Sequence, residues 1–456
     1  MPKKRSWQLK SWQKFLSPAR FLMIGFAVLA IVGAILLSLP VATENGEGLP
    51  FVDALFMATS AICVTGLVVV DTGSTLSMFG EVVLLTLVQI GGLGIMTVAT
   101  FVTIWTGKKI GLTERLHLQQ SLNVSSLEGL IRLSRNVVLM TLAIEFVFAL
   151  ILAYRFSGHM PLGKALYYGI FHSIAAFCNA GFDLFGDYKS LADYAGDPVV
   201  NISVMTLVSV GGLGMAVMAD LLRKLVNRKE RLMFHSKLVL IASVVLFVVG
   251  TLGYYALEHG NQGTLAEKSE GEQLLAAGFA SVTARSSGFA TINYEEMSQS
   301  GQFWTMMLMF IGASPGSAGG GIRTTTALVI LLFVWTVVTN RGQTVIFKRA
   351  ISPRVINKSL TIAVMSMTLI VVTTMILTIT ENREFNRVLF EAVSAVSTVG
   401  LSTNLTPELS PAGKVVVLIV MYIGRLGPLT LALALAARHQ GKPSNVRYPE
   451  GNVYVG

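Results

Sequence analysis

Four short stretches of this 456-residue chain each close a run of small and apolar residues with a glycine. The residues concerned are Val64, Thr65 and Gly66; Asn179, Ala180 and Gly181; Ser286, Ser287 and Gly288; and Thr398, Val399 and Gly400. Glycine reaches positive φ and lets two backbones approach closely. Such turns can aim carbonyl oxygens at one point, where a ring of carbonyls can replace the hydration shell of a cation. The four turns therefore form a candidate cation site.

Two further landmarks keep the same register as the turns. A phenylalanine precedes each turn glycine by nine or ten residues, and an Ile-Gly or Val-Gly pair follows it. The phenylalanines are Phe56, Phe171, Phe279 and Phe390, and the pairs are Ile90-Gly91, Val210-Gly211, Ile311-Gly312 and Ile423-Gly424. Three landmarks in four copies predict that one structural unit occurs four times, in parallel orientation.

Composition indicates a membrane protein. Hydrophobic residues make up 53% of the chain and charged residues only 13%, whereas soluble domains are about 25% charged. Many apolar runs reach the length of about 20 residues that a membrane-crossing helix needs. The first run, 21–39, is too long for the h-region of a signal peptide, so we interpret it as a retained span.

Each unit is predicted to contain a span, a half-helix, the glycine turn and a second span. The half-helix at 51–62 makes only about 18 Å of helix, too short to cross the membrane. The spans are expected at 20–39 and 78–105, 131–154 and 199–222, 236–257 and an interrupted 303–338, and 359–380 and 413–436; the other half-helices are expected at 164–177, 272–284 and 386–397.

This pattern predicts an all-α polytopic membrane protein with eight full spans around a pseudo-four-fold pore. The chain then divides into a cytoplasmic N-terminal segment (1–19), pore repeats at 20–106, 130–226, 234–340 and 354–438, and a cytoplasmic C-terminal tail (439–456). The third repeat contains the interrupted closing helix. Non-helical backbone at membrane depth survives only where it is buried or lines a wet cavity, so the four turns imply an aqueous path.

The net charge of +10 reflects topology, and nucleic acid is not the expected partner. Most Lys and Arg residues fall in five segments, 1–20, 106–136, 223–237, 340–358 and 438–456, while the remaining polar connections are acidic. By the positive-inside rule this alternation puts both termini in the cytoplasm of a plasma-membrane protein. The basic links are expected to contact anionic membrane lipid.

The orientation of the half-helices favours cations. A half-helix entering from outside points its carboxyl end, which carries partial negative charge, towards the middle of the membrane. Acidic outer loops would concentrate cations at the mouth. With a single glycine in each turn, we expect a short filter with loose selectivity.

The third closing span is broken by a glycine-rich run that includes Gly312, Pro315, Gly316, Gly319, Gly320 and Gly321. Proline and glycine at this density cannot hold a helix. We expect this loop to line the cavity on the cytoplasmic side of the turns and to work as a gate; the alternative is a static kink needed for packing.

Charges within the apolar segments are candidates for the same machinery. We expect Arg425 to project into the pore and set an electrostatic barrier; the alternative is a structural pair with Glu145 or Glu391. We expect Arg285 to lie behind the third turn against an acidic residue, Arg323 to anchor the broken loop, and Glu391 to act as a brace.

Other chemistries find little support. The two cysteines, Cys63 and Cys178, occupy equivalent places before two turns and are expected to be reduced lining residues. The six histidines show no metal-ligand spacing, so the only metal expected is the transported ion. The glycine clusters lack the complete spacing of phosphate loops. We expect no enzyme activity.

These motifs resemble a known family. The chain closely resembles the KtrB-type potassium transporter membrane subunits of the Trk/Ktr/HKT superfamily. The resemblance rests on the stretches 59–67, 89–94, 312–321 and 422–428. It implies potassium uptake, a filter at the four turn glycines, an intramembrane gating loop at 312–321 and a pore arginine at Arg425. Sodium-selective members tend to carry serine at the first filter glycine, so Gly66 favours potassium.

The resemblance also implies partners. It suggests a cytosolic ring of RCK-type regulatory subunits, KtrA or KtrC, that binds ATP or ADP and controls the gate, and a homodimer of this chain with the tail at 448–456 near its interface. Sodium as an activator is left open. The alternatives are a sodium-conducting relative and a cation-coupled secondary transporter. The latter needs paired acidic residues at midplane, which the spans lack.

Overall fold

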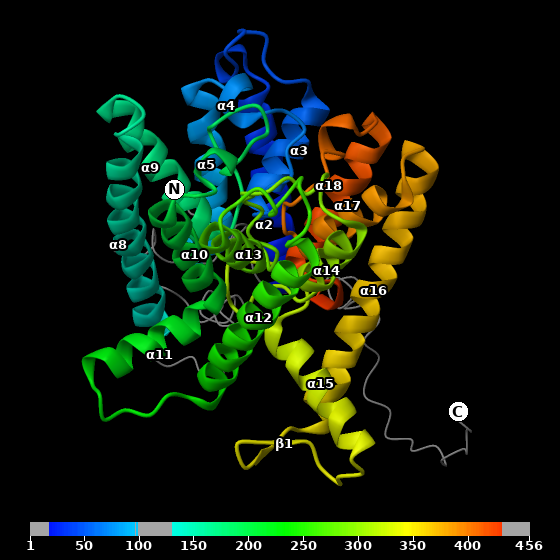
Figure 1. The fold of residues 1–456 in the computed structure, drawn as a ribbon. Coiled ribbons are helices and arrows are strands. Elements are labelled where there is room, and N and C mark those ends of the chain that lie inside the picture. Colours follow the sequence, from blue (N-terminus) through cyan, green and yellow to red (C-terminus); the bar gives the residue numbers. More distant parts are fainter. Residues whose placement is uncertain (1–17, 96, 99–129, 431–456) are drawn as a thin grey trace, which may run out of the picture.

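The regular structure is almost entirely helical (Figure 1). The computed structural model describes residues 18–95, 97–98 and 130–430. One order of three helices occurs four times along the chain, and we number these units 1 to 4. The opening helices are α2 (Pro18–Leu37), α8 (Leu130–Phe156), α12 (Phe234–Glu258) and α16 (Pro353–Glu381); the central helices are α3 (Phe51–Ile62), α9 (Leu162–Cys178), α13 (Glu270–Thr283) and α17 (Phe385–Ser397); the closing helices are α5 (Met78–Leu93), α10 (Pro198–Leu213), α14 (Gln299–Phe310) and α18 (Pro411–Leu426).

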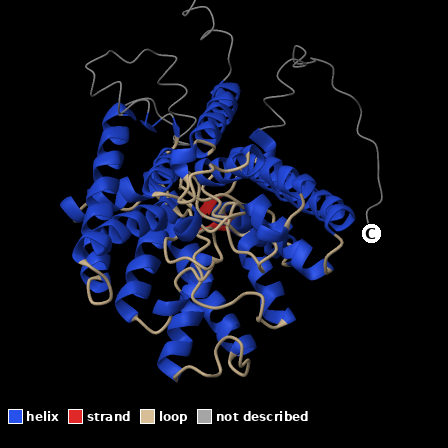
Figure 2. Ribbon diagram, turned by 90° about the horizontal axis from the view of Figure 1, so that it is seen from above, coloured by secondary structure: helices blue, strands red, loops and turns tan. Residues whose placement is uncertain are grey.

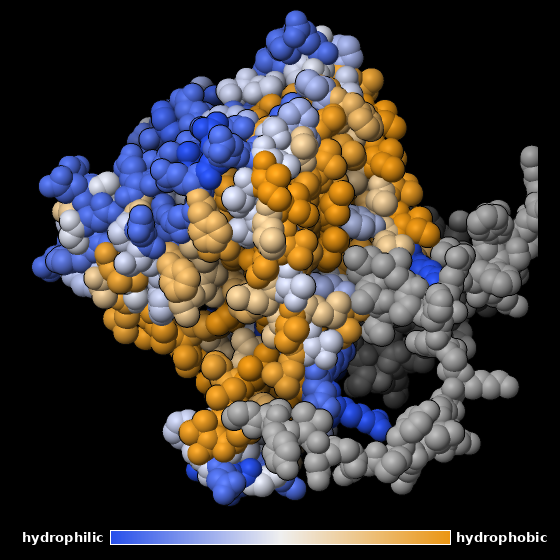
Figure 3. All heavy atoms as spheres, turned by 90° about the vertical axis from the view of Figure 1, so that its right-hand side faces the viewer, coloured by the Kyte–Doolittle hydropathy of each residue, from blue (hydrophilic) through white to orange (hydrophobic). Residues whose placement is uncertain are grey.

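The opening and central helices agree closely with the ranges predicted from the sequence. In the described part of the chain, four helices are long and apolar enough to cross a membrane, and these are the opening helices. Many of their side chains are exposed and apolar, such as Ile35, Leu150, Val248 and Val371. Figure 3 shows apolar residues covering much of one flank between hydrophilic groups at the top and bottom. The described helices thus supply four clear spans, or five with one bent pair, rather than eight.

The closing helices are where the sequence-based prediction was wrong. The continuous span predicted at 199–222 is broken after Leu213, and α11 (Met215–Val226) leaves α10 at 104°. The break falls at Gly214, whose φ is 91°. Gly94 ends α5 with φ 81° and Gly427 ends α18 with φ 83°. Each of these helices has 16 residues, about 24 Å, which is less than the hydrocarbon thickness of about 30 Å.

Unit 3 is interrupted over a longer stretch, as predicted. Helix α14 ends at Phe310 and the chain resumes as α15 (Thr324–Val338). A two-stranded hairpin that the sequence did not predict follows, with β1 (Val345–Ile346) antiparallel to β2 (Arg349–Ala350) and Val345 opposite Ala350. The short helices α4 (Thr72–Thr75), η1 (Pro40–Ala42), η2 (Ala192–Tyr194) and η3 (Thr406–Glu408) lie in the connections.

The conserved spacing of the Ile-Gly and Val-Gly pairs has a steric reason. A Cβ on Gly91 would lie 2.2 Å from the carbonyl oxygen of Ile62, the last residue of α3. The same test gives 1.9 Å between Gly211 and the Phe177 oxygen, and 2.2 Å between Gly424 and the Val396 oxygen. In units 1, 2 and 4, the glycine therefore lets the carboxyl end of the central helix abut the closing helix. In unit 3, Gly312 instead faces the carbonyl of Gly320, within the interrupted stretch.

The start of each closing helix is fixed by the end of the opening helix or the segment that follows it. In unit 4, the N-cap residue Ser410 donates from its backbone N and its Oγ to Glu381, at 2.8 and 2.7 Å. In unit 3, Ser298 donates from N and Oγ to Glu258, at 3.2 and 2.5 Å. In unit 1, the Ser77 hydroxyl donates to the Val41 carbonyl.

Unit 2 makes the same connection with donor and acceptor exchanged. Asp197 caps α10 by accepting from Val199 N and Val200 N, and its other oxygen pairs with Arg155 at the end of α8. An N-cap carboxylate or hydroxyl satisfies amide donors that the helix cannot. All four units therefore fix the angle between opening and closing helix at this end of the molecule.

The helices surround a centre made of loops and turns (Figure 2). The four landmark phenylalanines, Phe56, Phe171, Phe279 and Phe390, are almost completely buried in one continuous apolar core. The predictions for the segment 1–17, for the outer parts of the spans 78–105 and 413–436, and for the tail 439–456 lie outside the described residues.

Candidate cation site

The four glycine turns meet at the centre of the molecule and close a ring. A Cβ on Gly66 would lie 2.3 Å from the carbonyl oxygen of Ala180. The corresponding distances are 2.6 Å from Gly181 to the Ser287 oxygen, 2.8 Å from Gly288 to the Val399 oxygen, and 2.1 Å from Gly400 to the Thr65 oxygen. Each glycine thus packs against the turn of the next unit, and the last returns to the first. The four sites predicted from the sequence are brought together.

Backbone conformation explains why glycine stands in these positions. The φ angles of the four turn glycines are 92°, 65°, 78° and 96° in chain order. A side chain would be strained there by its own backbone and would also strike the neighbouring carbonyl. The four central helices end directly before these turns, so their carboxyl ends converge on the ring.

The first and fourth turns share an additional contact. The backbone N of Gly66 donates to Ser60 Oγ and that of Gly400 donates to Ser394 Oγ, each at 3.1 Å. The second and third turns have Ala175 and Val282 in the corresponding places, which offer no hydroxyl. Turns 1 and 4 are therefore alike, whereas turns 2 and 3 depart from them.

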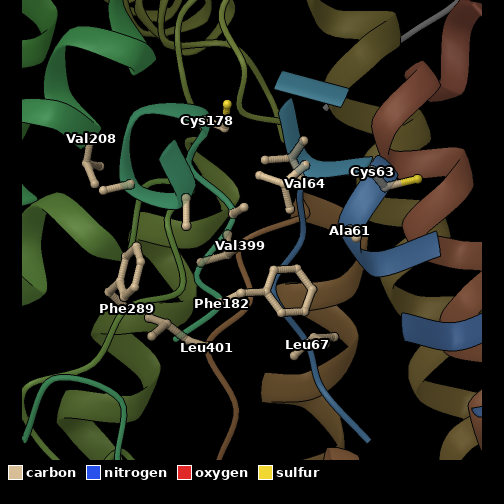
Figure 4. Packing of buried hydrophobic residues seen from close by; sticks show 14 of the residues in the cluster. Ala61, Cys63, Val64, Leu67, Cys178, Phe182, Val208, Phe289, Val399 and Leu401 are labelled. Carbon is tan, nitrogen blue, oxygen red and sulfur yellow. The ribbon is translucent and has the colours of Figure 1, made fainter. Parts of the chain in front are cut away.

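Apolar side chains pack around the ring. Val64, Phe182 and Val399, from units 1, 2 and 4, lie close together in one buried cluster (Figure 4). By contrast, the hydroxyl oxygens of three ring residues, Thr65, Ser287 and Thr398, are buried without a hydrogen-bond partner. Buried hydroxyls normally find partners, so these three ring residues are exceptions.

The two cysteines do not line the ring as expected. Cys178 is buried and its Sγ donates to Gln89 Oε1 of α5 at 3.4 Å. A Cβ on Gly92 of the same helix would lie 2.5 Å from that sulfur. The sulfur atoms of Cys63 and Cys178 point away from each other in Figure 4, so both residues pack behind the turns.

The interrupted stretch of unit 3, residues 311–323, lies directly against the ring. We call it the gate loop after the role expected of it from the sequence. A Cβ on Gly319 would lie 2.1 Å from Ser286 Oγ, and one on Gly320 would lie 2.0 Å from Thr398 Oγ1. The backbone N of Gly320 donates to Ser286 Oγ at 3.2 Å. The two glycines therefore fit against the third and fourth turns where no larger residue would.

The remaining loop residues are held by unit 2 and by the loop itself. A Cβ on Gly214, at the break of α10, would lie 2.4 Å from the Pro315 oxygen, and Met215 N donates to the Gly316 oxygen at 3.0 Å. Gly321 has φ 73° and lies against Gly312. The two ends of the loop thus lie next to each other.

Two arginines bind carbonyl oxygens of the gate loop. Arg323 donates to the Ser314 carbonyl at 3.4 Å and to the Gly319 carbonyl, so its predicted role as an anchor is confirmed. Arg425 donates to the carbonyls of Ala318 and of Gly91 in α5. The arginine of unit 4 therefore ties the loop to unit 1.

The alternative of a carboxylate partner for Arg425 is wrong. Glu145 accepts a hydrogen bond from Gln89 at 3.1 Å, and Glu391 accepts from Ser402 at 2.8 Å and from Thr406. Glu391 lies in α17 and its two partners follow the fourth turn, so its predicted role as a brace is confirmed.

Arg285 was expected to face an acidic residue, and this prediction is also wrong. Its Nη1 donates to the Ser243 carbonyl at 3.4 Å, and its buried Nε has no partner. None of the ion pairs formed within the described ranges involves it. The guanidinium lies behind the third turn beside a small cavity of about 10 Å³ shared with Asn179 and Ser314.

A larger cavity of about 870 Å³ is lined in part by residues of the gate loop. It reaches Val396 and Ser397, next to the fourth turn, and both arginines line it. Its walls come from the ends of α5 and α18 and from α12, α15 and α16. Residues of the loop therefore contact both the ring and this cavity.

The sequence analysis missed the side chains that join neighbouring units. Tyr167 of α9 donates to Glu81 of α5 at 2.6 Å, and Lys414 of α18 pairs with Asp53 of α3 at 2.6 Å. Asn386 of α17 donates to Gln302 of α14. In each pair, one residue is the fourth of a closing helix and directly follows a glycine. The repeated Ser-x-x-Gly motif at 77–80, 298–301 and 410–413 could therefore have pointed to these contact positions.

Comparison with known proteins agrees with this arrangement. A family model described as a cation transport protein, TrkH, matches residues 6–446. The chain belongs to the TrkH family of cation transport proteins.

Three known uptake proteins resemble the chain over nearly its whole length. The Ktr system potassium uptake protein B of Bacillus subtilis (strain 168) is 41% identical over 98% of both chains. The protein of the same name from Vibrio alginolyticus is 38% identical over 96% of this chain and 94% of its own. The potassium/sodium uptake protein NtpJ of Enterococcus hirae is 35% identical over 98% of this chain and 99% of its own.

A solved structure of another protein shares the fold of this chain. The crystal structure of the potassium transporter TrkH from Vibrio parahaemolyticus superimposes with a TM-score of 0.72, covering 92% of this chain and 85% of that one at 17% identity. Membership of the TrkH family and the apolar opening helices identify the chain as a membrane transport protein.

Proposed function

We propose that this chain is the ion-conducting subunit of a Ktr-type potassium uptake system. The observation that carries the proposal is the closed ring, in which each turn glycine packs against a carbonyl group of the next unit. Full-length relatives named as potassium uptake proteins support the choice of ion.

The ring suits a dehydrated cation. Carbonyl groups of the turns, with the unpartnered hydroxyl oxygens of Thr65, Ser287 and Thr398, offer only oxygen ligands. The carboxyl ends of four helices add partial negative charge on the same point. The site residues are the three at each turn, Val64–Gly66, Asn179–Gly181, Ser286–Gly288 and Thr398–Gly400.

The gate loop would control passage from the ring to the large cavity. Its glycines fill the space against the third and fourth turns, so ions cannot pass while it stays there. Arg425 places a positive charge at the same level and binds the loop, so it acts as barrier and latch together. Ion flow then requires the loop and the Arg425 guanidinium to move aside.

Topology follows from the same reading. Four parallel units around the ring give a pseudo-four-fold pore with eight membrane crossings, where the closing helices cross as broken segments. The short length of α5, α10 and α18 fits crossings that turn at Gly94, Gly214 and Gly427. The alternation of basic and acidic segments puts both termini in the cytoplasm.

Gating would come from a partner subunit. The relatives' designation as parts of a Ktr system supports a second component. We propose that it is a cytosolic RCK-type ring that binds ATP or ADP and acts on the gate loop, and that two copies of this chain form the membrane part. The hairpin β1–β2 lies next to α15 and carries the basic residues Lys348 and Arg349. It suits contact with such a ring or with anionic lipid.

A sodium-conducting function is the second candidate, and sodium as an activator belongs with it. The observation in its favour is the relative from Enterococcus hirae, whose name includes both ions. The glycine at position 66 favours potassium.

The deciding experiment measures rubidium flux into liposomes that contain the purified chain with its regulatory subunit. A potassium-uptake-deficient bacterium that expresses both should also grow at low potassium. We expect flux that potassium inhibits far more strongly than sodium does. Absence of rubidium flux with the regulatory subunit present would reject the proposal, and equal inhibition by sodium would support the second candidate.

A further inference from the structure

The residue two places before each turn glycine has positive φ, although none of the four is a glycine. Val64, Asn179 and Thr398 have φ of 57°, 60° and 49°, in the left-handed helical region. Ser286, their counterpart in unit 3, has φ 131°. A φ of 131° lies outside the left-handed helical region. Residues other than glycine rarely adopt this value, and they are strained when they do.

Backbone hydrogen bonds show the same exception. The residue before the glycine donates to the carbonyl five positions back in three units, which is the closure of a Schellman motif. The pairs are Thr65 to Ser60 at 2.8 Å, Ala180 to Ala175 at 2.8 Å and Val399 to Ser394 at 2.9 Å. In unit 3, Ser287 N donates to Thr283, only four back, at 3.0 Å. The third turn is therefore built differently from the other three.

The gate loop touches the third turn at the exceptional residue. Ser286 Oγ accepts from Gly320 N at 3.2 Å, and Gly319 leaves no room for a side chain against the same oxygen. In the other units a closing-helix glycine abuts the end of the central helix, whereas in unit 3 Gly312 faces the loop. The loop thus occupies the place that elsewhere supports the regular turn.

We propose that Ser286 couples the gate loop to the shape of the ring. While the loop is in place, its hydrogen bond holds Ser286 at φ 131° and keeps the third turn out of the Schellman closure. When the loop withdraws, Ser286 adopts the left-handed conformation of its three counterparts, and Ser287 N shifts from Thr283 to the Val282 carbonyl.

This proposal rests on the proposed potassium function and adds a specificity-determining residue to it. The carbonyl groups of Ser286 and Ser287 rotate with the change, so the ring has four similar turns only when the gate is open. Selectivity and opening are then linked through one side chain, and the closed ring is a poor cation site in its third quarter.

Two substitutions of Ser286 separate the hydrogen bond from the strain. Ser286→Ala removes the acceptor but keeps a Cβ, so the closed state loses its bond and retains its strain. Ser286→Gly also removes the acceptor, but glycine adopts φ 131° without strain. In liposomes without the regulatory subunit, we expect rubidium flux to rise about tenfold at most in Ser286→Ala, and clearly less in Ser286→Gly.

The matched control is Ser281→Ala, on the same central helix. Its hydroxyl donates to the Phe247 carbonyl at 3.0 Å, away from the gate loop, and we expect flux at the wild-type level. Equal flux in the two Ser286 variants, or more in Ser286→Gly, overturns the coupling while leaving the potassium function intact. Loss of wild-type flux with the regulatory subunit present would reject the potassium function itself.

A structure of the full chain with its regulatory subunit in an open state provides a test that does not depend on the variants folding. We expect Ser286 to have φ near that of Thr398 and Ser287 N to lie within hydrogen-bond distance of the Val282 oxygen. A withdrawn loop with Ser286 still near φ 131° would overturn the proposal.

Discussion

Substituting each turn glycine by alanine should damage the ring in a graded order. A Cβ would approach the facing carbonyl oxygen to 2.1 Å at Gly400, 2.3 Å at Gly66, 2.6 Å at Gly181 and 2.8 Å at Gly288. Real Cβ atoms essentially never come closer than 3.0 Å, so the shortfall is greatest at Gly400. The neighbours are backbone atoms, which cannot rotate away. We therefore expect the order Gly400, Gly66, Gly181, Gly288 from most to least harmful.

The magnitude follows from two contributions. Each alanine meets positive φ, which costs about 1–2 kcal/mol, and each also displaces a carbonyl group that faces the ion. If the displacement weakens the preference for potassium by a similar free energy, the potassium-to-sodium flux ratio falls about 5- to 30-fold. At Gly288, where the shortfall is smallest, the change should lie at the lower end of this range.

The assay is rubidium uptake into liposomes, with inhibition by potassium and sodium measured for each variant at equal amounts of folded protein. Gly163→Ala in α9 is the matched control, because a Cβ there meets nothing within 4 Å. An unchanged ratio in the Gly400 variant would refute the assignment of the ring as the selective site. A larger effect at Gly288 than at Gly400 would refute the steric reasoning.

Three further predictions concern charged groups. Lys414→Met should leave the largely buried Asp53 carboxylate without its ion-pair partner and lower the free energy of unfolding by about 2 kcal/mol. Scanning fluorimetry should show a lower Tm for this variant, and adding Asp53→Asn should partly restore it. An unchanged Tm would contradict this prediction. Asp183 follows the second turn, and burial, aided by the neighbouring Asp71 charge, raises its pKa to about 7. Its negative charge is present above this pH and lost below it, so uptake at limiting potassium should fall about two- to tenfold from pH 8 to pH 6. The Asp183→Asn variant should lack this pH dependence. Arg425→Ala should raise rubidium flux without the regulatory subunit, because the loop loses one tie and the pore one positive charge; a fall in flux would reject its role as a barrier.

The sequence predicted the central helices and the turn residues well, because local chemistry decides both. A short apolar run that ends in glycine has few alternatives at membrane depth. The residues of all four turns could be named in advance, and their convergence followed from the repeated register.

The breaks in the closing helices were harder to predict. Gly94, Gly214 and Gly427 lie inside apolar runs, where a glycine is equally compatible with close helix packing. Only the structure shows that each has positive φ and ends its helix. Within unit 3, proline and clustered glycines made the break evident.

Long-range partners could not be predicted, because they depend on how units are placed around the ring. Arg285 and Arg425 were each assigned carboxylates as possible partners, yet both bind backbone carbonyl oxygens. Glycine-rich backbone offers such oxygens without side chains, and no sequence pattern marks them.

The contact between Gly400 and Thr65 has a consequence for biosynthesis. It joins residues near opposite ends of the chain, and so does the pair of Lys414 with Asp53. In a nascent chain that has inserted only three units, the ring therefore lacks its fourth turn, which is synthesised last. The selective path can form only when synthesis is nearly complete, so unfinished chains have no means of assembling this ring and discharging the membrane potential through it.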